Sequence, residues 1–246
     1  MKKQIMETQT IKIQYLYHSG FRVETKKHLF IFDYLQGKLS MGNKNILVFC
    51  SHAHPDHFNP RIFEWQRNNP SSKYILSDDI RISDDLKVKE KKENIYFMSP
   101  SDEIQIEDVN IKAYGSTDVG VSFLIEWSGI HLFHAGDLNW WHWWRDTPEG
   151  IEKAEQWFKE ELAKIKPEPI DIAFFPVDPR LEHNYCLGAD YFLQELTPKI
   201  LIPMHFGDDF EVSKKYTEKM KDHPTKVIGF TKEEQEIILD IPITLS

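Results

Sequence analysis

The segment Ser51–Phe58, S-H-A-H-P-D-H-F, gathers potential metal ligands within a few positions of one another. Three histidines and one aspartate stand there: His52, His54, Asp56 and His57. Their spacing does not fit one face of a helix, where metal ligands recur at positions i and i+4. Neutral imidazoles together with a carboxylate are donors that zinc takes in proteins. We therefore predict a loop that curls around a metal ion, with these residues as ligands.

One loop rarely supplies a complete coordination shell, and two further donors follow apolar runs elsewhere in the chain. Asp137 ends the run I-H-L-F-H-A-G-D, and His205 ends the run I-L-I-P-M-H. The histidine loop itself follows N-I-L-V-F-C at 45–50, a short apolar run typical of a buried strand. Asp137 and His205 are therefore predicted ligands from two other segments.

The elements that must position these residues can be predicted from hydrophobic periodicity. Apolar residues recur at every second position in 11–18, and short apolar runs predict further strands at 21–24, 29–34, 74–77, 94–98, 104–114, 121–127, 130–136, 171–177 and 199–206. Three- and four-residue spacing predicts an amphipathic helix over 149–165. Other helices are expected at 59–68, where Asn59 caps and Pro60 opens the first turn, near 188–197, and at about 209–222. Two short strands would close the chain.

The order of the predicted strands and helices indicates the architecture, and one segment has neither a predicted strand nor a predicted helix. Long meanders of strands interrupted by single helices favour two sheets with helices outside them. We expect residues 1–246 to form one domain. The charge-rich segment 78–93 is expected to be a solvated loop or edge.

Composition narrows the class of protein. The chain has 246 residues and a net charge of −9, which argues against the basic surface of a nucleic-acid-binding protein. No stretch approaches the roughly 18 apolar residues of a membrane helix, and M-K-K-Q-I-M-E-T-Q-T lacks the apolar core of a signal peptide. Cys50 and Cys186 are the only cysteines, consistent with a reducing compartment. We expect a cytoplasmic protein that acts on a small molecule, without membrane or nucleic-acid partners.

At this point the sequence resembles the metallo-β-lactamase superfamily over nearly its whole length. The signature H-x-H-x-D-H stands at residues 52–57, and Y-H-S-G-F, I-F-D-Y, H-A-G-D and I-P-M-H occur in the family's order. The opening and the H-A-G-D run look most like the lactonase-like branch, which includes L-ascorbate-6-phosphate lactonase. The resemblance implies an α+β fold, a four-layer αββα sandwich with metals at the strand ends between the sheets.

The resemblance also implies a division of the ligands between two metals. His52 and His54 would hold one, Asp56, His57 and His205 the other, and Asp137 would lie between them. Flavodiiron relatives have glutamate where His54 stands, so His54 favours the hydrolase side of the superfamily.

Residues 113–120, A-Y-G-S-T-D-V-G, depart from the family pattern because they contain no histidine where the family has a further ligand. Asp118 could replace it with an oxygen, unless it is simply a turn residue; Ser116 or Thr117 could do so weakly or through water. Alternatively the first site is vacant, or His142 is its ligand. A carboxylate would shift preference toward manganese or iron. We expect one or two divalent ions, Zn²⁺ first, with Mn²⁺ or Fe²⁺ as alternatives.

The segment L-N-W-W-H-W-W at 138–144 follows Asp137 directly. Its indoles, Trp141 among them, could form an aromatic wall over the metals or anchor the loop by burial. His142 is a candidate ligand or proton carrier.

Other residues near the motifs have two interpretations each. Arg180 could clamp a carboxylate or phosphate, or pair with Asp178 or Glu182. Asp33 is expected to hold the histidine loop by accepting backbone N–H bonds. His18 and His134 are interpreted as structural histidines.

These observations favour hydrolysis by a metal-bound hydroxide of an ester, lactone or phosphodiester in a small, anionic or neutral substrate. Asp56, Asp137 and His142 are the predicted catalytic residues, and Asp56 or His142 would carry a proton to the leaving group. The alternatives are a mononuclear iron redox enzyme of the same superfamily and a degenerate, non-catalytic metal-binding module. A nuclease is disfavoured by the net charge.

Overall fold

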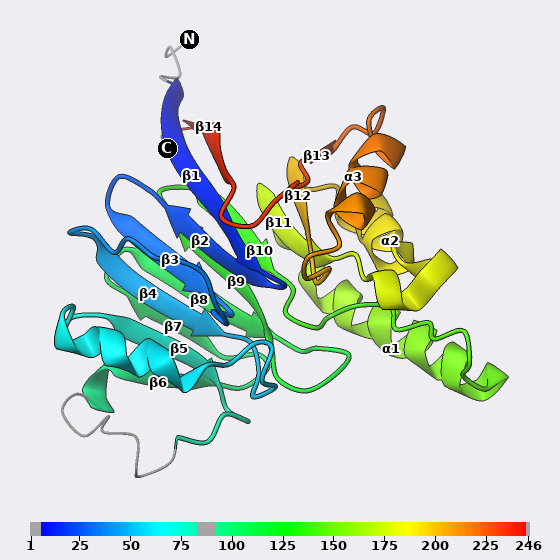
Figure 1. Ribbon diagram of the computed structural model, residues 1–246, viewed down its shortest axis with the longest axis horizontal. Coiled ribbons are helices and arrows are strands. Elements are labelled where there is room, and N and C mark those ends of the chain that lie inside the picture. The colour runs from blue at the N-terminus through cyan, green and yellow to red at the C-terminus, as the bar shows by residue number, and fades with distance from the viewer. Residues whose placement is uncertain (1–5, 83–91, 245–246) are drawn as a thin grey trace.

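Two seven-stranded mixed sheets form the centre of the molecule (Figure 1). The computed structural model describes residues 6–82 and 92–244. The first sheet has the order β14-β1-β2-β3-β4-β5-β6, built from Glu236–Thr244, Met6–Tyr17, Gly20–Glu24, His28–Phe32, Asn45–Cys50, Lys73–Ser77 and Ile95–Met98. The second sheet has the order β13-β12-β11-β10-β9-β8-β7, built from Lys226–Val227, Ile200–Met204, Ile172–Pro176, Ile130–His134, Ser122–Trp127, Val109–Tyr114 and Glu103–Ile106.

In each sheet several strands run in the same direction, so their carboxyl ends lie at one edge. Strands β3, β4, β5 and β6 are parallel, and β1 runs the same way as β3 because both pair antiparallel with β2. In the second sheet β10, β11, β12 and β13 are parallel. Parallel strands covered on both faces have near-continuous apolar sequences, and β3, β11 and β12 are buried at every position.

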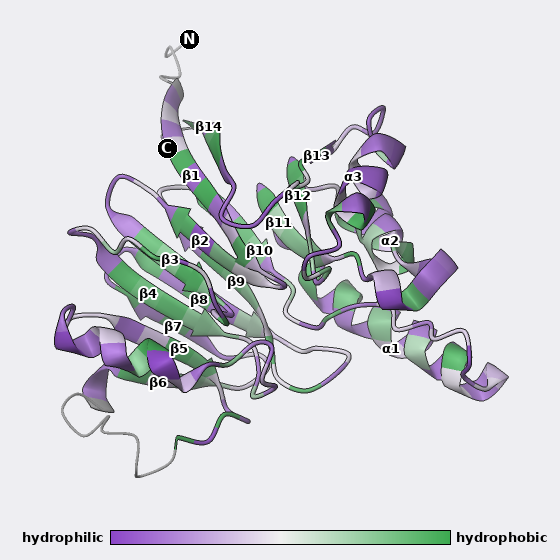
Figure 2. Cartoon of the chain, in the orientation of Figure 1, coloured by the Kyte–Doolittle hydropathy of each residue, from purple (hydrophilic) through white to green (hydrophobic). Residues whose placement is uncertain are grey.

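Helices cover both outer faces of the paired sheets. Helices α1 (Pro148–Ile165), α2 (Leu187–Leu196) and α3 (Phe210–Lys219) lie beside the second sheet, while the 3₁₀ helix η1 (Pro60–Arg67) covers the first (Figure 1). Two further 3₁₀ helices are η2 (Lys92–Asn94) and η3 (Pro179–Asn184). One core cluster draws on both sheets, and a smaller one lies between η1 and the outer face of the first sheet. Figure 2 shows the apolar strands and the helices with one apolar stripe.

The predicted αββα sandwich is confirmed, with local differences. The helix predicted over 149–165 is α1, whose cap Thr147 accepts a hydrogen bond from the N–H of Gly150. The helix predicted over 59–68 is a 3₁₀ helix, although Asn59 caps it as expected. The single strand predicted over 104–114 is the hairpin β7–β8, and the last strand, β14, is long and pairs with β1.

Two expectations fall at least partly outside the described residues. Most of the charge-rich segment 78–93 and the start of the N-terminal segment lie there. Among the helices of residues 6–82 and 92–244, none combines the length and the apolar character that crossing a membrane requires.

Candidate metal centre

The predicted ligands meet where strands of both sheets end. The histidine loop follows β4, Asp137 follows β10 after two residues, and His205 follows β12 directly. The carboxyl ends of β10 and β12 share one edge of the second sheet because both strands run parallel to β11. The distances below show that the end of β4, in the first sheet, faces that edge. His205 has a φ of 69°, a left-handed conformation that non-glycine residues rarely adopt.

The donors fall into two half-sites on either side of Asp137. Donor atoms of His54 and Asp118 lie within 4.8 Å of Asp137, as do those of His52 and His57, and a separate group contains Asp56, His57 and His205. We call His52, His54 and Asp118 half-site A, and Asp56, His57 and His205 half-site B. In half-site A, His52 Nε2 lies 3.0 Å from His54 Nδ1 and 3.5 Å from Asp137 Oδ2, while His54 Nδ1 lies 3.8 Å from Asp118 Oδ2. His52 is fully buried, whereas the side chains of His54 and Asp118 are nearly half exposed.

Asp137 stands at the centre of half-site B. Its Oδ1 lies 3.1 Å from Nε2 of His57 and 3.1 Å from Nε2 of His205. Neither pair is aligned as a hydrogen bond, so all three buried atoms lack a hydrogen-bond partner within the described chain. Buried polar atoms without a partner are rare and cost about 1–3 kcal/mol each. A divalent cation would satisfy all three, so the donor set fits a metal.

The charges of the ligands follow from their burial and their neighbours. Burial alone would raise the pKa of Asp137, but His205 and His57 hold it well below its usual range. Burial would lower the pKa of His57, yet Asp33 and Asp137 raise it to about 10. Burial lowers the pKa of His52, with a further contribution from His57. In the metal-free protein at neutral pH, Asp137 is therefore a carboxylate and His52 is neutral.

Two buried carboxylates orient the histidines of half-site B. His57 Nδ1 donates to Asp33 Oδ2 at 2.7 Å, and His205 Nδ1 donates to Asp178 Oδ2 at 2.9 Å. Each bond leaves Nε2 directed at the site, the usual arrangement around metal-binding histidines. Asp33 also accepts from the backbone N–H of Ser51 at 2.7 Å, which is the loop-holding contact expected from the sequence. The sequence does not predict the hydrogen bond from His205 to Asp178. The only indication is that Asp178 follows the apolar run of β11 and should therefore lie near the ends of the neighbouring strands.

The segment without a histidine places only Asp118 among the ligands. Thr117 donates to the carbonyl of Asn139 at 2.6 Å and accepts from its N–H at 2.9 Å, so its hydroxyl is already engaged. Gly120 has a φ of 81°, and a Cβ there would lie 2.1 Å from the carbonyl oxygen of Ser51. This contact fixes the Asp118 loop against the histidine loop.

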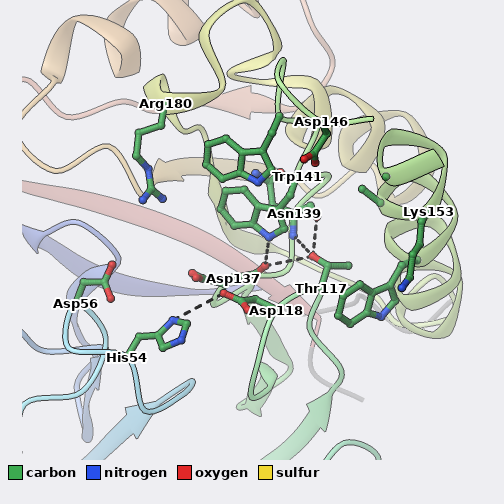
Figure 3. Close-up of a pocket in the computed structure, with 14 residues that line it drawn as sticks. His54, Asp56, Thr117, Asp118, Asp137, Asn139, Trp141, Asp146, Lys153 and Arg180 are labelled. Atoms are coloured by element: carbon green, nitrogen blue, oxygen red, sulfur yellow. Dashed lines mark hydrogen bonds and ion pairs between the residues drawn. The ribbon is translucent and has the colours of Figure 1, made fainter. Parts of the chain in front are cut away.

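The tryptophans of this segment divide between burial in the core and the lining of a cavity. Trp140 is buried against Phe158 of α1, whereas Trp141 and Trp143 are stacked and line a cavity of about 530 Å³ beside the ligands (Figure 3). Trp141 donates its indole N–H to the carbonyl of Asp137 at 3.0 Å. The structure does not bring His142 into either half-site or the cavity lining.

The cavity has a metal-facing end and an opposite wall. His54, Asp56, Asp118 and Asp137 line the first, and Lys153 of α1 lines the second (Figure 3). Trp157 of α1 also lines the cavity. Arg180 also reaches the cavity, but its guanidinium makes paired hydrogen bonds to Asp178 of 2.6 and 3.0 Å. The ion-pair interpretation of Arg180 is therefore the one that the geometry supports.

The two histidines interpreted as structural differ. His134 is fully buried with both ring nitrogens engaged, by the carbonyl of Ser19 and the N–H of Gly136. His18, by contrast, lies in half-site B with Asp56, His57 and His205. The family resemblance places His18 near the site, but the interpretation as a structural histidine did not include it among the ligands.

Solved structures with the same architecture include several metal-dependent proteins. Igni18, a metallo hydrolase from the archaeon Ignicoccus hospitalis, is 18% identical, with a TM-score of 0.65 over 94% of this chain and 99% of that one. The metallo-beta-lactamase fold protein YhfI from Bacillus subtilis is 12% identical, with a TM-score of 0.61 over 94% and 99%. CmlA, a diiron beta-hydroxylase from Streptomyces venezuelae, is 10% identical, with a TM-score of 0.60 over 94% of this chain and 54% of that one.

Sequence comparisons give one family and no curated relative. No curated protein matches the chain. The sequence model of the beta-lactamase superfamily domain matches residues 12–141, more than half of the chain, from within β1 to Trp141. The matched residues include the histidine loop and Asp137, and the structural neighbours share the arrangement of the sheets. The chain belongs to the beta-lactamase superfamily and has the metallo-β-lactamase fold.

Proposed function

We propose that this protein is a metal-dependent hydrolase of a small ester, lactone or phosphodiester. The observation that carries the proposal is the convergence of Asp137 Oδ1 with Nε2 of His57 and of His205, all buried and without an aligned hydrogen bond among the described residues. The three atoms lie 3.1 Å apart in two contacts, yet neither contact is aligned as a hydrogen bond, and one cation placed between them would satisfy all three. Two buried carboxylates that orient the histidines add to the support.

Half-sites A and B would hold the cations, with Asp137 shared between them. A divalent cation supplies two things to hydrolysis when bound: it lowers the pKa of a coordinated water toward ~7 and polarises the oxygen of the bond under attack. Zn²⁺ fits the imidazole-rich half-site B. The carboxylate of Asp118 makes half-site A richer in oxygen, which suits Mn²⁺ or Fe²⁺ better.

The protein's own residues would position the substrate and move the proton. Asp56 lines the cavity and is partly exposed, so it can reach a leaving group and carry a proton to it. Trp141 and Trp143 present an apolar wall to the substrate. A cavity of about 530 Å³ suits a small molecule, and the chain's charge of −9 disfavours a polyanionic nucleic acid.

The decisive experiment combines metal content with hydrolysis. The purified protein is analysed for metals per chain and assayed on matched nitrophenyl esters, aliphatic lactones and bis-nitrophenyl phosphate. We expect bound metal and hydrolysis of at least one class, both lost in Asp137→Asn and both retained in Asp222→Asn, which alters an exposed aspartate. A fully active Asp137→Asn variant, or a wild-type protein that binds no metal after reconstitution, would refute the proposal.

A second candidate is iron-dependent oxidation. It is favoured by Asp118, because a carboxylate ligand suits iron, and the fold is shared with a protein described as a diiron beta-hydroxylase. Iron as the dominant metal, together with oxygen consumption in the presence of a thiol or other reductant and no hydrolysis, would replace the hydrolase by this candidate.

A further inference from the structure

His18 occupies a position that a structural histidine does not need. It is the first residue after β1, and its ring lies 4.0 Å from that of His205 and 5.6 Å from that of His57, centroid to centroid. Its Nε2 is 3.5 Å from Asp56 Oδ2. Donor atoms of these four residues all lie within 4.8 Å of one another, which is close enough for one cation to gather them.

The Nε2 atom of His18 lies beside Asp56, His57 and His205 and makes no hydrogen bond among the described residues. His18 Nε2 is buried and makes no hydrogen bond within the described chain, and only 13% of the side chain is exposed. His134, a neighbouring buried histidine, has both nitrogens engaged. The same fold therefore satisfies one histidine internally and leaves the other with a donor atom aimed at ligand residues.

The backbone holds His18 in place at the expense of an unfavourable conformation. Its φ is 58°, in the left-handed region that residues other than glycine adopt uncommonly, here in the turn between β1 and β2. Its N–H donates to the hydroxyl of Tyr15 at 2.8 Å, and its carbonyl accepts from the N–H of His205 at 2.9 Å. The Tyr15 hydroxyl in turn donates to the carbonyl of Gly207 at 2.5 Å. The end of β1 is thereby tied to the end of β12, so His18 and His205 share one rigid frame.

We propose that His18 is a metal ligand of half-site B, and that half-site B consequently takes up the first metal ion. The inference rests on the metal site proposed above. With His18, half-site B offers three imidazoles on a frame fixed by Asp33 and Asp178. Half-site A offers two imidazoles and the exposed Asp118. The half-site with more nitrogen donors, held more rigidly, should bind Zn²⁺ or Co²⁺ more tightly.

Two variants separate the ring of His18 from its backbone. His18→Gly keeps both backbone hydrogen bonds and accepts the positive φ without strain, but removes the imidazole. His18→Asn also tolerates this conformation and can still donate a hydrogen bond to Asp56. His54→Ala is the matched control, because it removes an imidazole from half-site A alone.

The measurement is a Co²⁺ titration of metal-free protein followed by visible absorption, repeated with Zn²⁺ by calorimetry. Loss of outer partners of metal-binding residues weakens affinity 10–100-fold, so loss of a ligand should weaken the first equivalent by about 100-fold or more. We expect this in both His18 variants, with an altered cobalt spectrum. His54→Ala should keep the first equivalent and its spectrum and lose the second.

A purely structural role predicts a different result. His18→Gly would then lower the melting temperature in EDTA and leave the affinity for the first metal ion unchanged. A ligand role instead predicts that His18→Gly has an unchanged or higher melting temperature in EDTA and that metal raises this temperature less than in the wild type. The inference would be overturned if His18→Gly bound the first metal ion as tightly as the wild type. It would also be overturned if only His18→Asn did so, because the role of His18 would then be a hydrogen bond to Asp56. Failure of the wild-type protein to bind either metal would instead refute the proposed function.

Discussion

Replacement of Asp33 by alanine should damage the fold and the metal site together. Asp33 is fully buried and accepts three hydrogen bonds of 2.7 Å, from the N–H and hydroxyl of Ser51 and from Nδ1 of His57. The Ser51 hydroxyl also lies 3.0 Å from His52 Nδ1 and can pair there instead. The N–H of Ser51 and Nδ1 of His57 would be left unpaired.

The size of the effect follows from those two groups. An unpaired buried donor costs about 1–3 kcal/mol, so Asp33→Ala should lower the free energy of unfolding of the metal-free protein by about 2–6 kcal/mol. The freed ring of His57 should also weaken the metal held by half-site B by about 10–100-fold. Because such a loss can approach the whole stability of a domain, Asp33→Asn, which keeps one acceptor oxygen, provides a milder second variant.

The assay is urea unfolding in EDTA, with a competition titration against a zinc chelator for the affinity. The control is Asp171→Ala, which removes another buried carboxylate that accepts the N–H of His131 at 2.7 Å and pairs with Lys199 at 2.6 Å. Asp171 precedes β11, whereas Asp178 follows the opposite end of that strand. The control should lose stability and keep metal affinity. A loss below about 1 kcal/mol in Asp33→Ala, with unchanged zinc affinity, would refute the reasoning.

Three further predictions concern single residues. Burial would raise the pKa of Asp171, but hydrogen bonds from His131 and Lys199 outweigh it and lower the pKa from 3.8 to about 2. The ionised carboxylate should therefore add about 2 kcal/mol to the free energy of unfolding above pH ~4, and this contribution should be lost as the pH falls through 2. The difference in melting temperature between wild type and Asp171→Asn should shrink over that range, and a pH-independent difference would contradict the prediction. Gly120→Ala should cost at least about 2 kcal/mol, measured by urea unfolding, because its Cβ would meet the carbonyl of Ser51 at a positive φ; equal midpoints would count against the contact. His142→Ala should keep the metal content of the wild type in elemental analysis, since its ring lies outside both half-sites; loss of a metal would restore it as a ligand.

The sequence was informative wherever a donor follows a buried strand. Asp137 and His205 each come after an apolar run, and parallel strands bring such ends to one edge of their sheet. The histidine loop also follows an apolar run, and the family resemblance placed it with the other two. The layered fold followed from the same runs. Their roles as ligands remain predictions that the metal titrations above will test.

Sequence periodicity could not show how loops turn or how the two sheets face each other. His142 is one residue from Trp141, yet hydrogen bonds from its N–H to Trp140 and from Trp143 to Trp141 bend the chain at every step. Neighbours in such a loop face different directions. His18 and Asp178 lie near His205 only because the ends of β1, β11 and β12 meet, and the sequence does not encode that approach locally. The 3₁₀ geometry of η1 was likewise hidden, since its cap and proline suit an α-helix equally.

The pairing of β1 with β14 has a consequence for how this protein emerges during synthesis. Thr10 and Asp240, which are hydrogen-bonded across this pair, are 230 positions apart. At about 5–20 residues per second, the ribosome needs on the order of ten to fifty seconds to deliver the partner of the first strand. Throughout that interval the long outer edge of β1 has unpaired backbone groups, which invite association with other chains. We therefore expect chains truncated before β14 to associate through the edge of β1 more readily than the full-length protein does.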